Sequence, residues 1–361
     1  MASDQINVLA LTKYPRLAAS SRHRFLDYIP LLAERNVQVA SVPLLSERYV
    51  KRRLSGERTD YVDVTRSYTS RLIELISRST HFDVLWIEGE LFPRFPAIFE
   101  RLLQGFGRPF VIDLDDAIFH TYDLHPSWLV RSLLGRKIDV VLGHATAVTA
   151  GNDYLADRAR LAGARRVAVV PTTVDELAYG MAAHSAGDQL SFGWIGSSYT
   201  QHYVQTVGQQ LRELCYSLPA TLRLIGVEQI DFACPNVVLR PWDEGTQIEE
   251  IAHCDIGLAP LFDGPWERGK CGLKAIQYMA AGIPVLAADV GVLPRIVSHG
   301  QTGFVYRDGA EFASFARKLA SDEKLRMEMG MAGRERVASH FSIRRWAKTV
   351  CDLLIEAASR A

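Results

Sequence analysis

The sequence lacks the marks of several large protein classes. Its five cysteines are few for 361 residues, lie far apart and show no metal-ligand spacing, which argues against a disulfide scaffold and a zinc site. No apolar run is long enough to cross a bilayer, and no basic stretch followed by an apolar one marks a signal peptide. The 41 basic and 41 acidic residues balance to a net charge of +0, which argues against nucleic acid as a partner. We therefore expect a cytoplasmic enzyme that uses its cysteines as small apolar residues.

A dinucleotide-binding G-x-G-x-x-G fingerprint is also missing after the first expected strand. Short apolar strands nevertheless alternate with helical stretches along the chain, a pattern that predicts parallel sheets. Because a single hydrophobic core stops growing well below 361 residues, we expect two domains. Strands are expected at residues 6–11, 37–42, 82–87, 109–114, 147–152, 167–171, 190–196, 221–226, 237–240, 255–261, 284–288 and 300–306. Helices are expected at residues 25–35, 247–253, 271–281, 310–320 and 323–339, with a terminal helix beginning near residue 341.

The most informative stretch runs from Asp263 to Asp289. It reads as a loop punctuated by glycines, a helix from about Cys271 to Ala281 that Gly282 ends, and a short buried strand. The first N–H groups of a helix lack partners and its dipole is positive there, so this helix start suits an anion.

Positive side chains gather near the same helix start. Arg268 and Lys270 precede it, and helical spacing places Lys270, Lys274 and Gln277 on one face. A phosphate or diphosphate is the expected ligand. The alternative is that the two lysines only solvate a surface helix.

Residues 270–285, KCGLKAIQYMAAGIPV, resemble the donor-binding signature of the retaining glycosyltransferases of family four (group 1), in a bacterial branch with GKCGLK and QYMAAGIPV. That family usually carries two glutamates eight positions apart in this stretch. Alignment on Gly282 and Pro284 places Gly269 and Gln277 at those two positions. The resemblance covers most of the chain and is strongest from about residue 190 to residue 341.

The resemblance implies an α/β protein of the GT-B fold, with two Rossmann-like, doubly wound parallel-sheet domains facing a cleft. It implies an acceptor-side domain at residues 1–173, joined by a C-terminal helix at about 345–361, and a nucleotide-sugar-binding domain at residues 174–344. Residues 176–189 are expected to form a linker. The implied reaction moves a sugar from a nucleoside-diphosphate sugar to a hydroxyl acceptor with retention of configuration, without a metal or other cofactor.

On the donor side, small hydroxyl residues follow the expected strand 190–196, where a helix start suits phosphate. By resemblance, the loop after strand 237–240 lies near the nucleotide base. A packing role for Gly196 and a core-filling role for Trp242 are the alternatives. The predicted donor-binding residues are Gly196, Ser197, Ser198, Arg240, Trp242, Arg268, Lys270, Cys271, Gly272, Leu273, Lys274 and Gln277.

In the N-terminal domain, two arginines and a serine replace the glycine-rich loop that the family has after its first strand. The predicted acceptor-side residues are Tyr14, Ser21, Arg22, Arg24 and Glu90. The predicted catalytic residues are Asp115, Asp116, His120, Arg268 and Lys270. Two structural alternatives stay open: the arginines pair with acids such as Asp27, or the carboxylates cap the next helix or bind these arginines.

The acidic cluster of Asp113, Asp115 and Asp116 is similar to the metal-binding D-x-D of GT-A glycosyltransferases. The setting differs, because GT-A chains have one nucleotide domain and this chain repeats the strand–helix pattern in two halves. We therefore expect no metal at these residues.

Cations crowd residues 47–58, where Tyr49, Val50 and Leu54 accompany five basic side chains. The stretch predicts either weak peripheral contact with an anionic membrane or a solvated helix or loop. Two other functions fit the same scaffold: a nucleotide-sugar epimerase or hydrolase, and a non-catalytic sugar-nucleotide-binding subunit. The first would turn over the donor without an acceptor, and the second would bind nucleotide without forming product.

Overall fold

The computed structural model describes residues 5–182, 189–230 and 232–360, which divide into two compact units. The first unit comprises Met1–Thr172, Arg268–Cys271 and Ile343–Ala361, and the second comprises Thr173–Glu267 and Gly272–Ser342. The expected linker at residues 176–189 opens with a short 3-10 helix, η3 (Glu176–Ala178). Its residues 183–188 lie outside the described residues, as do the first four residues of the chain.

The first unit is built on a sheet of six parallel strands in the order β2-β1-β3-β4-β5-β6. Its strands are β1 (Ile6–Thr12), β2 (Val37–Pro43), β3 (Val84–Glu88), β4 (Phe110–Leu114), β5 (Ala147–Ala150) and β6 (Val167–Val169). All six match strands expected from the sequence. The strand order reverses between β1 and β3, and ligands of open parallel sheets bind at the carboxyl ends of the strands beside such a reversal.

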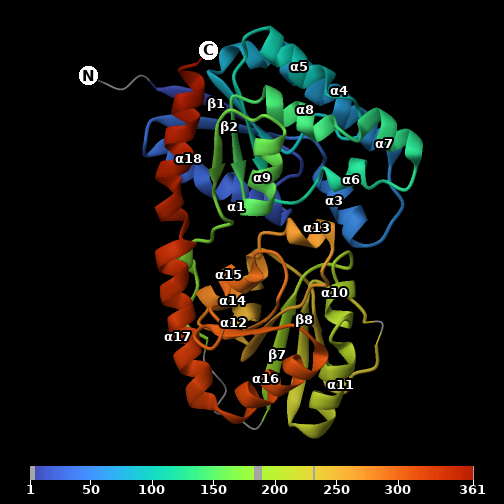
Figure 1. Cartoon of the computed structure of the whole chain (residues 1–361), viewed down its shortest axis with the longest axis vertical. Helices are drawn as coiled ribbons and strands as arrows, with labels where there is room; N and C mark the ends of the chain where they lie inside the picture. The colour runs from blue at the N-terminus through green and yellow to red at the C-terminus, as the bar shows by residue number, and fades with distance from the viewer. Residues whose placement is uncertain (1–4, 183–188, 231, 361) are drawn as a thin grey trace. The chain divides into compact units, whose positions relative to one another are not determined.

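Helices cover both faces of the first sheet (Figure 1). The helices of this unit are α1 (Ala19–Arg24), η1 (Leu26–Tyr28), α2 (Ile29–Ala33), α3 (Glu47–Leu54), α4 (Tyr61–Arg78), η2 (Ser79–His81), α5 (Ile98–Gly105), α6 (His120–Asp123), α7 (Trp128–Leu134), α8 (Lys137–His144), α9 (Asp153–Leu161) and α18 (Ile343–Ala358). The prediction of a single helix at residues 25–35 is wrong. The chain is already helical at Ala19, and the helix restarts near Pro30, which has no N–H for a helix interior.

The terminal helix α18 closes one side of the first core. Its residues Ile343, Ala347, Val350 and Leu354 recur at helical spacing and are buried in the same apolar cluster as Trp86. The helix runs along β1, β3 and β4 (Figure 1). An apolar stripe of this kind needs a partner surface, and the sheet supplies it.

The second unit has a sheet of the same kind, in the order β12-β11-β10-β7-β8-β9 with all strands parallel. Its strands are β7 (Leu190–Ile195), β8 (Ala220–Ile225), β9 (Val237–Arg240), β10 (Ile256–Ala259), β11 (Val285–Ala288) and β12 (Gly303–Tyr306). All six were expected. The order reverses between β7 and β10, so the loops after these two strands lie where a ligand is expected.

The remaining helices belong to the second unit, apart from the last residue of α13. They are α10 (His202–Gln205), α11 (Gly208–Ser217), α12 (Gln247–Ala252), α13 (Pro265–Arg268), α14 (Leu273–Ala280), α15 (Leu293–Ile296), α16 (Gly309–Ser321) and α17 (Glu323–His340). None of the helices in the described residues combines the length and hydrophobicity that a membrane crossing requires.

Helix α14, the helix of the signature, begins later than expected. Gly272 at its N-cap has a φ of 70°, a left-handed conformation that suits glycine and does not continue a right-handed helix. The helix therefore begins at Leu273, and Lys270 lies before it in a loop. The expected helical face shared by Lys270, Lys274 and Gln277 does not form.

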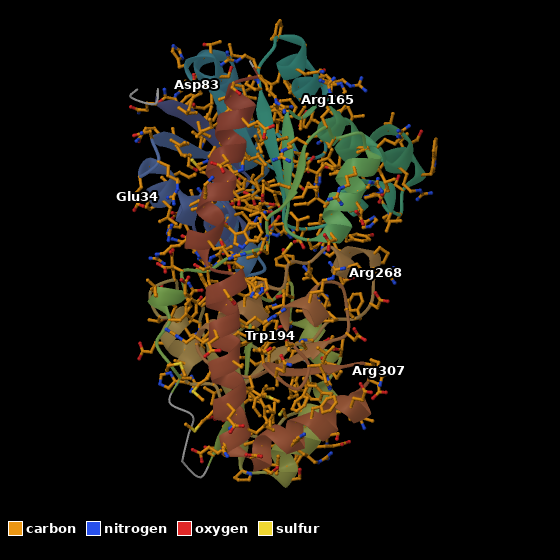
Figure 2. All side chains as sticks on the ribbon, turned by 60° about the vertical axis from the view of Figure 1, so that its left-hand side comes forward. Glu34, Asp83, Arg165, Trp194, Arg268 and Arg307 are labelled. Atoms are coloured by element: carbon orange, nitrogen blue, oxygen red, sulfur yellow. The ribbon has the colours of Figure 1, made fainter. Side chains whose placement is uncertain are left out.

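A strand glycine seats helix α14 against the second sheet. Tyr278 is fully buried, and a Cβ on Gly257 would lie 2.3 Å from its Cγ. Glycine inside this strand thus makes room for the tyrosine ring. In the neighbouring strand, a Cβ on Gly193 would lie 2.2 Å from the Cys254 sulfur, so that glycine makes room for the cysteine. Trp194, beside Gly193, lies in the interior of the unit (Figure 2).

Candidate functional site

Part of the signature belongs to the first unit. Residues Arg268–Cys271 are grouped there, although their chain neighbours on both sides are in the second unit. The side chain of Asn152 donates from Nδ2 to the carbonyl oxygens of Gly269 at 2.9 Å and of Lys270 at 3.0 Å. The Cys271 thiol lies 3.0 Å from the carbonyl oxygen of Asp115 and donates to it.

Gly269 stands where the related family has its first glutamate, and the structure explains the glycine. A Cβ at this position would lie 2.5 Å from the Cβ of Ala117 and 2.8 Å from its backbone nitrogen. No side chain fits without moving the backbone that follows β4. The structure therefore leaves no room for a glutamate side chain at position 269, where two backbone segments are in close contact.

Lys270 lies beside the predicted catalytic aspartates. Its Nζ is 3.4 Å from Oδ1 of Asp116, and both side chains are partly exposed. Asp115 and Asp116 directly follow β4, so they lie at the carboxyl edge of the first sheet. The structure brings together three of the five predicted catalytic residues: Asp115, Asp116 and Lys270.

Glu88 joins this acidic edge, and sequence reasoning missed it. It is the last residue of β3 and is buried, and its Oε2 accepts from the Ser21 hydroxyl at 2.6 Å and the Lys13 backbone N–H at 2.8 Å. These donors follow β1, so Glu88 lies where the strand order reverses. The signal in the sequence was its position at the end of the expected strand 82–87.

Burial changes the ionisation of this edge. Burial raises the pKa of Asp115 well above its ordinary value, and the charges of Asp116, Glu88 and Asp113 raise it further. Burial also raises the pKa of Glu88, although the hydrogen bonds from Ser21 and from the Lys13 backbone partly offset this. The folded protein therefore favours the protonated form of these two carboxyl groups more than water does.

Arg24 has a structural role, as the second alternative from the sequence anticipated. Its guanidinium donates to both oxygens of Asp113, at 2.9 and 2.6 Å, and to the carbonyl of Val170 at 2.7 Å. Although burial disfavours its charge, the attraction of Asp113 raises the pKa of Arg24. Asp113 is thus occupied by a buried arginine.

Most other predicted residues of the first unit also have partners in the protein. Glu90 is buried, accepts from the Tyr122 hydroxyl and forms an ion pair with Lys137. Arg22 is buried and donates to the carbonyl of Arg16 at 3.5 Å. These contacts account for the burial of the Glu90 and Arg22 side chains without a bound sugar acceptor.

Tyr14 and His120 also have hydrogen-bond partners in the first unit. The backbone N–H of Tyr14 donates to the Ser21 hydroxyl at 3.2 Å, which connects the loop after β1 to Glu88 through that serine. His120 has Nδ1 2.7 Å from Oδ1 of Asp123 and Nε2 2.8 Å from the hydroxyl of Tyr154. Both imidazole nitrogens thus have partners within the first unit.

In the second unit, the ends of β7, β8 and β9 are joined by backbone hydrogen bonds. Gly196 donates its N–H to the carbonyl of Ile225 at 2.9 Å, and Gly226 donates to the carbonyl of Arg240 at 2.8 Å. Gly226 has a φ of 91°, and a Cβ there would lie 2.0 Å from the Gly196 carbonyl oxygen. Glycine at position 226 therefore permits this close approach of the strand ends.

The hydroxyl residues after β7 form a turn before α10, so the expected helix start at Ser197 is wrong. Thr200 Oγ1 accepts from the Ser197 N–H at 3.1 Å and holds the turn, while Ser198 is exposed. Trp242 is half-buried, packs on the core and donates from its indole to Gln247 at 3.2 Å. The guanidinium of Arg240 is exposed, with Nε 3.6 Å from Glu250.

The remaining signature residues are in different surroundings. Lys274 places its ammonium 4.6 Å from the centre of the Trp194 ring, in cation–π geometry. Gln277 is buried and donates to the Tyr179 hydroxyl at 3.3 Å, so its amide is used inside the unit. Arg268, at the end of α13, is exposed (Figure 2).

The cations at residues 47–58 are largely compensated. Arg48 and Arg52 lie 3.5 and 3.3 Å from Asp60, and Lys51 lies 3.8 Å from Glu47. These pairs favour the solvated helix over an anionic membrane surface, and peripheral membrane contact stays a prediction. Within the described residues, no group of three or more histidine, cysteine or acidic side chains is placed to hold a metal ion.

Part of the chain is similar in sequence to known glycosyltransferases. Residues 191–322 match the family model described as group 1 glycosyl transferases. The D-inositol 3-phosphate glycosyltransferase of Streptomyces avermitilis is 49% identical over 63 residues, 17% of this chain and 14% of the relative. The enzyme of the same name from Corynebacterium kroppenstedtii is 27% identical over 257 residues, 66% of this chain and 49% of the relative. The chain thus spans no more than about half the length of these curated relatives.

Solved structures share the fold over nearly the whole chain. Sucrose-phosphate synthase of Thermosynechococcus elongatus superposes with a TM-score of 0.72 at 14% identity, covering 99% of this chain and 100% of that one. HepE of Anabaena, solved with UDP-glucose, gives a TM-score of 0.67 at 15% identity and covers 97% of this chain and 99% of its own. The fold is GT-B, with one Rossmann-like parallel sheet in each unit.

The raised pKa of Asp115 makes stability depend on pH. In the interval from the ordinary aspartate pKa up to the raised value, the native state binds more protons than the unfolded state, so the free energy of unfolding falls as pH rises. Asp115→Asn cannot ionise. The free energy of unfolding of Asp115→Asn, minus that of the natural chain, should therefore be larger at about pH 8 than at about pH 5. Urea unfolding at the two pH values measures this difference.

A matched control is Asp157→Asn, whose exposed carboxylate pairs with Arg160 on the surface. It should leave the pH dependence of unfolding unchanged. An equal pH dependence for Asp115→Asn and the natural chain would contradict the prediction.

Proposed function

We propose that this chain is a group 1 glycosyltransferase that moves a sugar from a nucleoside-diphosphate sugar to a hydroxyl acceptor. We propose retention of configuration and a place in polysaccharide, glycolipid or glycoconjugate synthesis, on the resemblance of the signature. The observation that carries the proposal is the reversal of strand order between β7 and β10, because ligands of open parallel sheets bind at such a point. The loop after β7 contains the Gly196–Ser198 turn, and the loop after β10 leads into the signature. Both loops lie within the residues that match the family model. The cytoplasmic location rests on the sequence and stays a prediction.

We assign donor binding to the turn after β7 and to residues 268–274. A nucleoside diphosphate carries negative charge that grows as the sugar leaves, and fixed cations and backbone N–H groups stabilise that charge. Arg268, Lys270 and Lys274 supply the cations. Trp242 and the backbone of Arg240 remain the residues proposed for the base. HepE, which shares the fold, was solved with UDP-glucose, and this supports a uridine donor as the first to test.

We assign the acceptor hydroxyl to the acidic edge of the first unit. Asp115, Asp116 and Glu88 are carboxyl groups close to Lys270 and Ser21, and such groups orient a hydroxyl by accepting or donating a hydrogen bond. Burial holds Asp115 and Glu88 toward the neutral form, which donates as well as accepts. Glu90, Arg22 and Arg24 take no part in this proposal, because each has a structural partner.

A donor screen tests the function. Because a ligand that binds only the native state raises the melting temperature, we expect a thermal shift with one class among UDP, GDP, ADP and dTDP sugars. That donor should then yield a glycoside with a hydroxyl acceptor, detected by mass spectrometry. Donor turnover without an acceptor would favour an epimerase or hydrolase. Binding without product across an acceptor panel would favour a non-catalytic subunit.

Lys270→Ala should lower kcat by roughly a hundredfold to a thousandfold, because it removes a cation from charge that develops in the transition state. The measurement is steady-state glycosyl transfer at varied donor concentration. Lys348→Ala is the control, since the side chain of that lysine is exposed on the surface of α18, where it pairs with Asp352. A near-normal kcat/KM in Lys270→Ala would remove Lys270 from the mechanism.

Transfer should survive excess EDTA, because we propose that side chains and backbone stabilise the departing diphosphate. Asp113, one of the three acids that could hold a metal, is already paired with Arg24. The test is the initial rate of transfer with and without chelator. Loss of activity that magnesium restores would instead assign a metal to the acidic edge.

A further inference from the structure

We infer that Asn152 is a positioning residue, which holds segment 268–271 and thereby fixes Lys270 beside Asp116. The contacts of Asn152 do not depend on the reaction, whereas the consequence for catalysis rests on the proposed role of Lys270. Nothing in the signature itself points to Asn152, which lies more than a hundred residues earlier in the chain.

The Asn152 side chain is buried and uses both ends of its amide. Its Oδ1 accepts from the Leu155 N–H at 3.0 Å and caps α9. Its Nδ2 donates to two consecutive carbonyls, of Gly269 and Lys270. Because α9 buries Leu155, Ala156 and Ala159 in the first core, the amide is held by a fixed helix. The Asn152 amide nitrogen therefore holds the two peptide groups that flank the Cα of Lys270.

Close packing restricts the same backbone from two other directions. Gly269 touches Ala117 so closely that no Cβ fits, and a Cβ on Gly151 would lie 2.2 Å from the Cys271 sulfur. The segment is thus held by the loop after β4, by the end of β5 and by the cap of α9. With its backbone fixed in this way, the Lys270 ammonium reaches Asp116 from a defined position.

Asparagine suits this position better than aspartate, which is chemically close. An aspartate would cap α9 equally well, because carboxylate and amide oxygens both accept at an N-cap. It would lose both donors, however, and would place a carboxylate oxygen against two carbonyl oxygens. Asn152→Asp therefore separates the role of the residue in the helix from its role in holding the segment.

The first measurement is independent of catalysis. Cys271 is 8% exposed and packed under Gly151, so N-ethylmaleimide should modify it slowly in the natural chain. In Asn152→Asp the rate at Cys271 should rise roughly tenfold, because lost hydrogen bonds permit local opening. Buried Cys254, in the second unit, should keep its rate. Peptide mass spectrometry reads both sites, and an unchanged rate at Cys271 would overturn the inference.

A second variant protects the test if Asn152→Asp folds poorly. Gly269→Ala should also speed modification of Cys271, because its Cβ cannot fit against Ala117. Gly105→Ala is the matched control, since a Cβ there meets open space. Slow modification of Cys271 in Gly269→Ala, equal to that in the control, would likewise overturn the proposed packing.

The second measurement tests positioning. Asn152→Asp should lower kcat by roughly 10- to 100-fold, the effect of a small displacement of a catalytic group, with a smaller change in the donor KM. The double variant with Lys270→Ala should transfer no more slowly than Lys270→Ala alone, because Asn152 acts through Lys270. An unchanged kcat, or additive losses, would overturn positioning. If the natural chain transfers no sugar, the proposed function fails, and maleimide modification still decides whether Asn152 holds the segment.

Discussion

The buried ion pair between Arg24 and Asp113 organises the carboxyl edge of the first sheet. The arginine comes from α1 and the aspartate ends β4, and the same guanidinium binds the carbonyl that follows β6. A buried charge without its partner costs several kcal/mol, so α1 is held against the sheet. This fixes Ser21, and through its hydroxyl the loop after β1 and Glu88. The position of the acidic edge thus depends on a pair that takes no part in the proposed chemistry.

Glycines position the signature in a comparable way, by permitting close contacts. Gly269 lets the backbone lie directly on Ala117, Gly272 ends the loop in a left-handed conformation, and Gly257 leaves space for the Tyr278 ring. Each contact is too close for a side chain, so together they set where the loop ends and the helix begins. At Gly269 the close contact with Ala117 leaves no room for a side chain, and the backbone there accepts hydrogen bonds from Asn152.

Much of the fold could be predicted from the sequence, and the site much less so. The twelve strands of the described residues were predicted because buried parallel strands are short apolar runs bounded by polar or glycine residues. The choice between Glu88 and Glu90 could not be made, since both lie at the end of the same strand. Glu90 is engaged by Tyr122 and Lys137, which are distant from it in the sequence. The late start of α14 was also missed, because it follows from the left-handed φ of Gly272, which the local apolar pattern does not reveal.

Local apolar pattern by itself determined the two parallel sheets and the position of the signature between a strand and a helix. The tertiary structure decided which charged side chains are structural and which lie at the site. Arg24 meets Asp113 across 89 residues, and Asn152 meets Gly269 across 117. A pairing at such separation leaves no periodic trace in the chain, because it arises only when distant strand ends gather at one edge of a folded sheet.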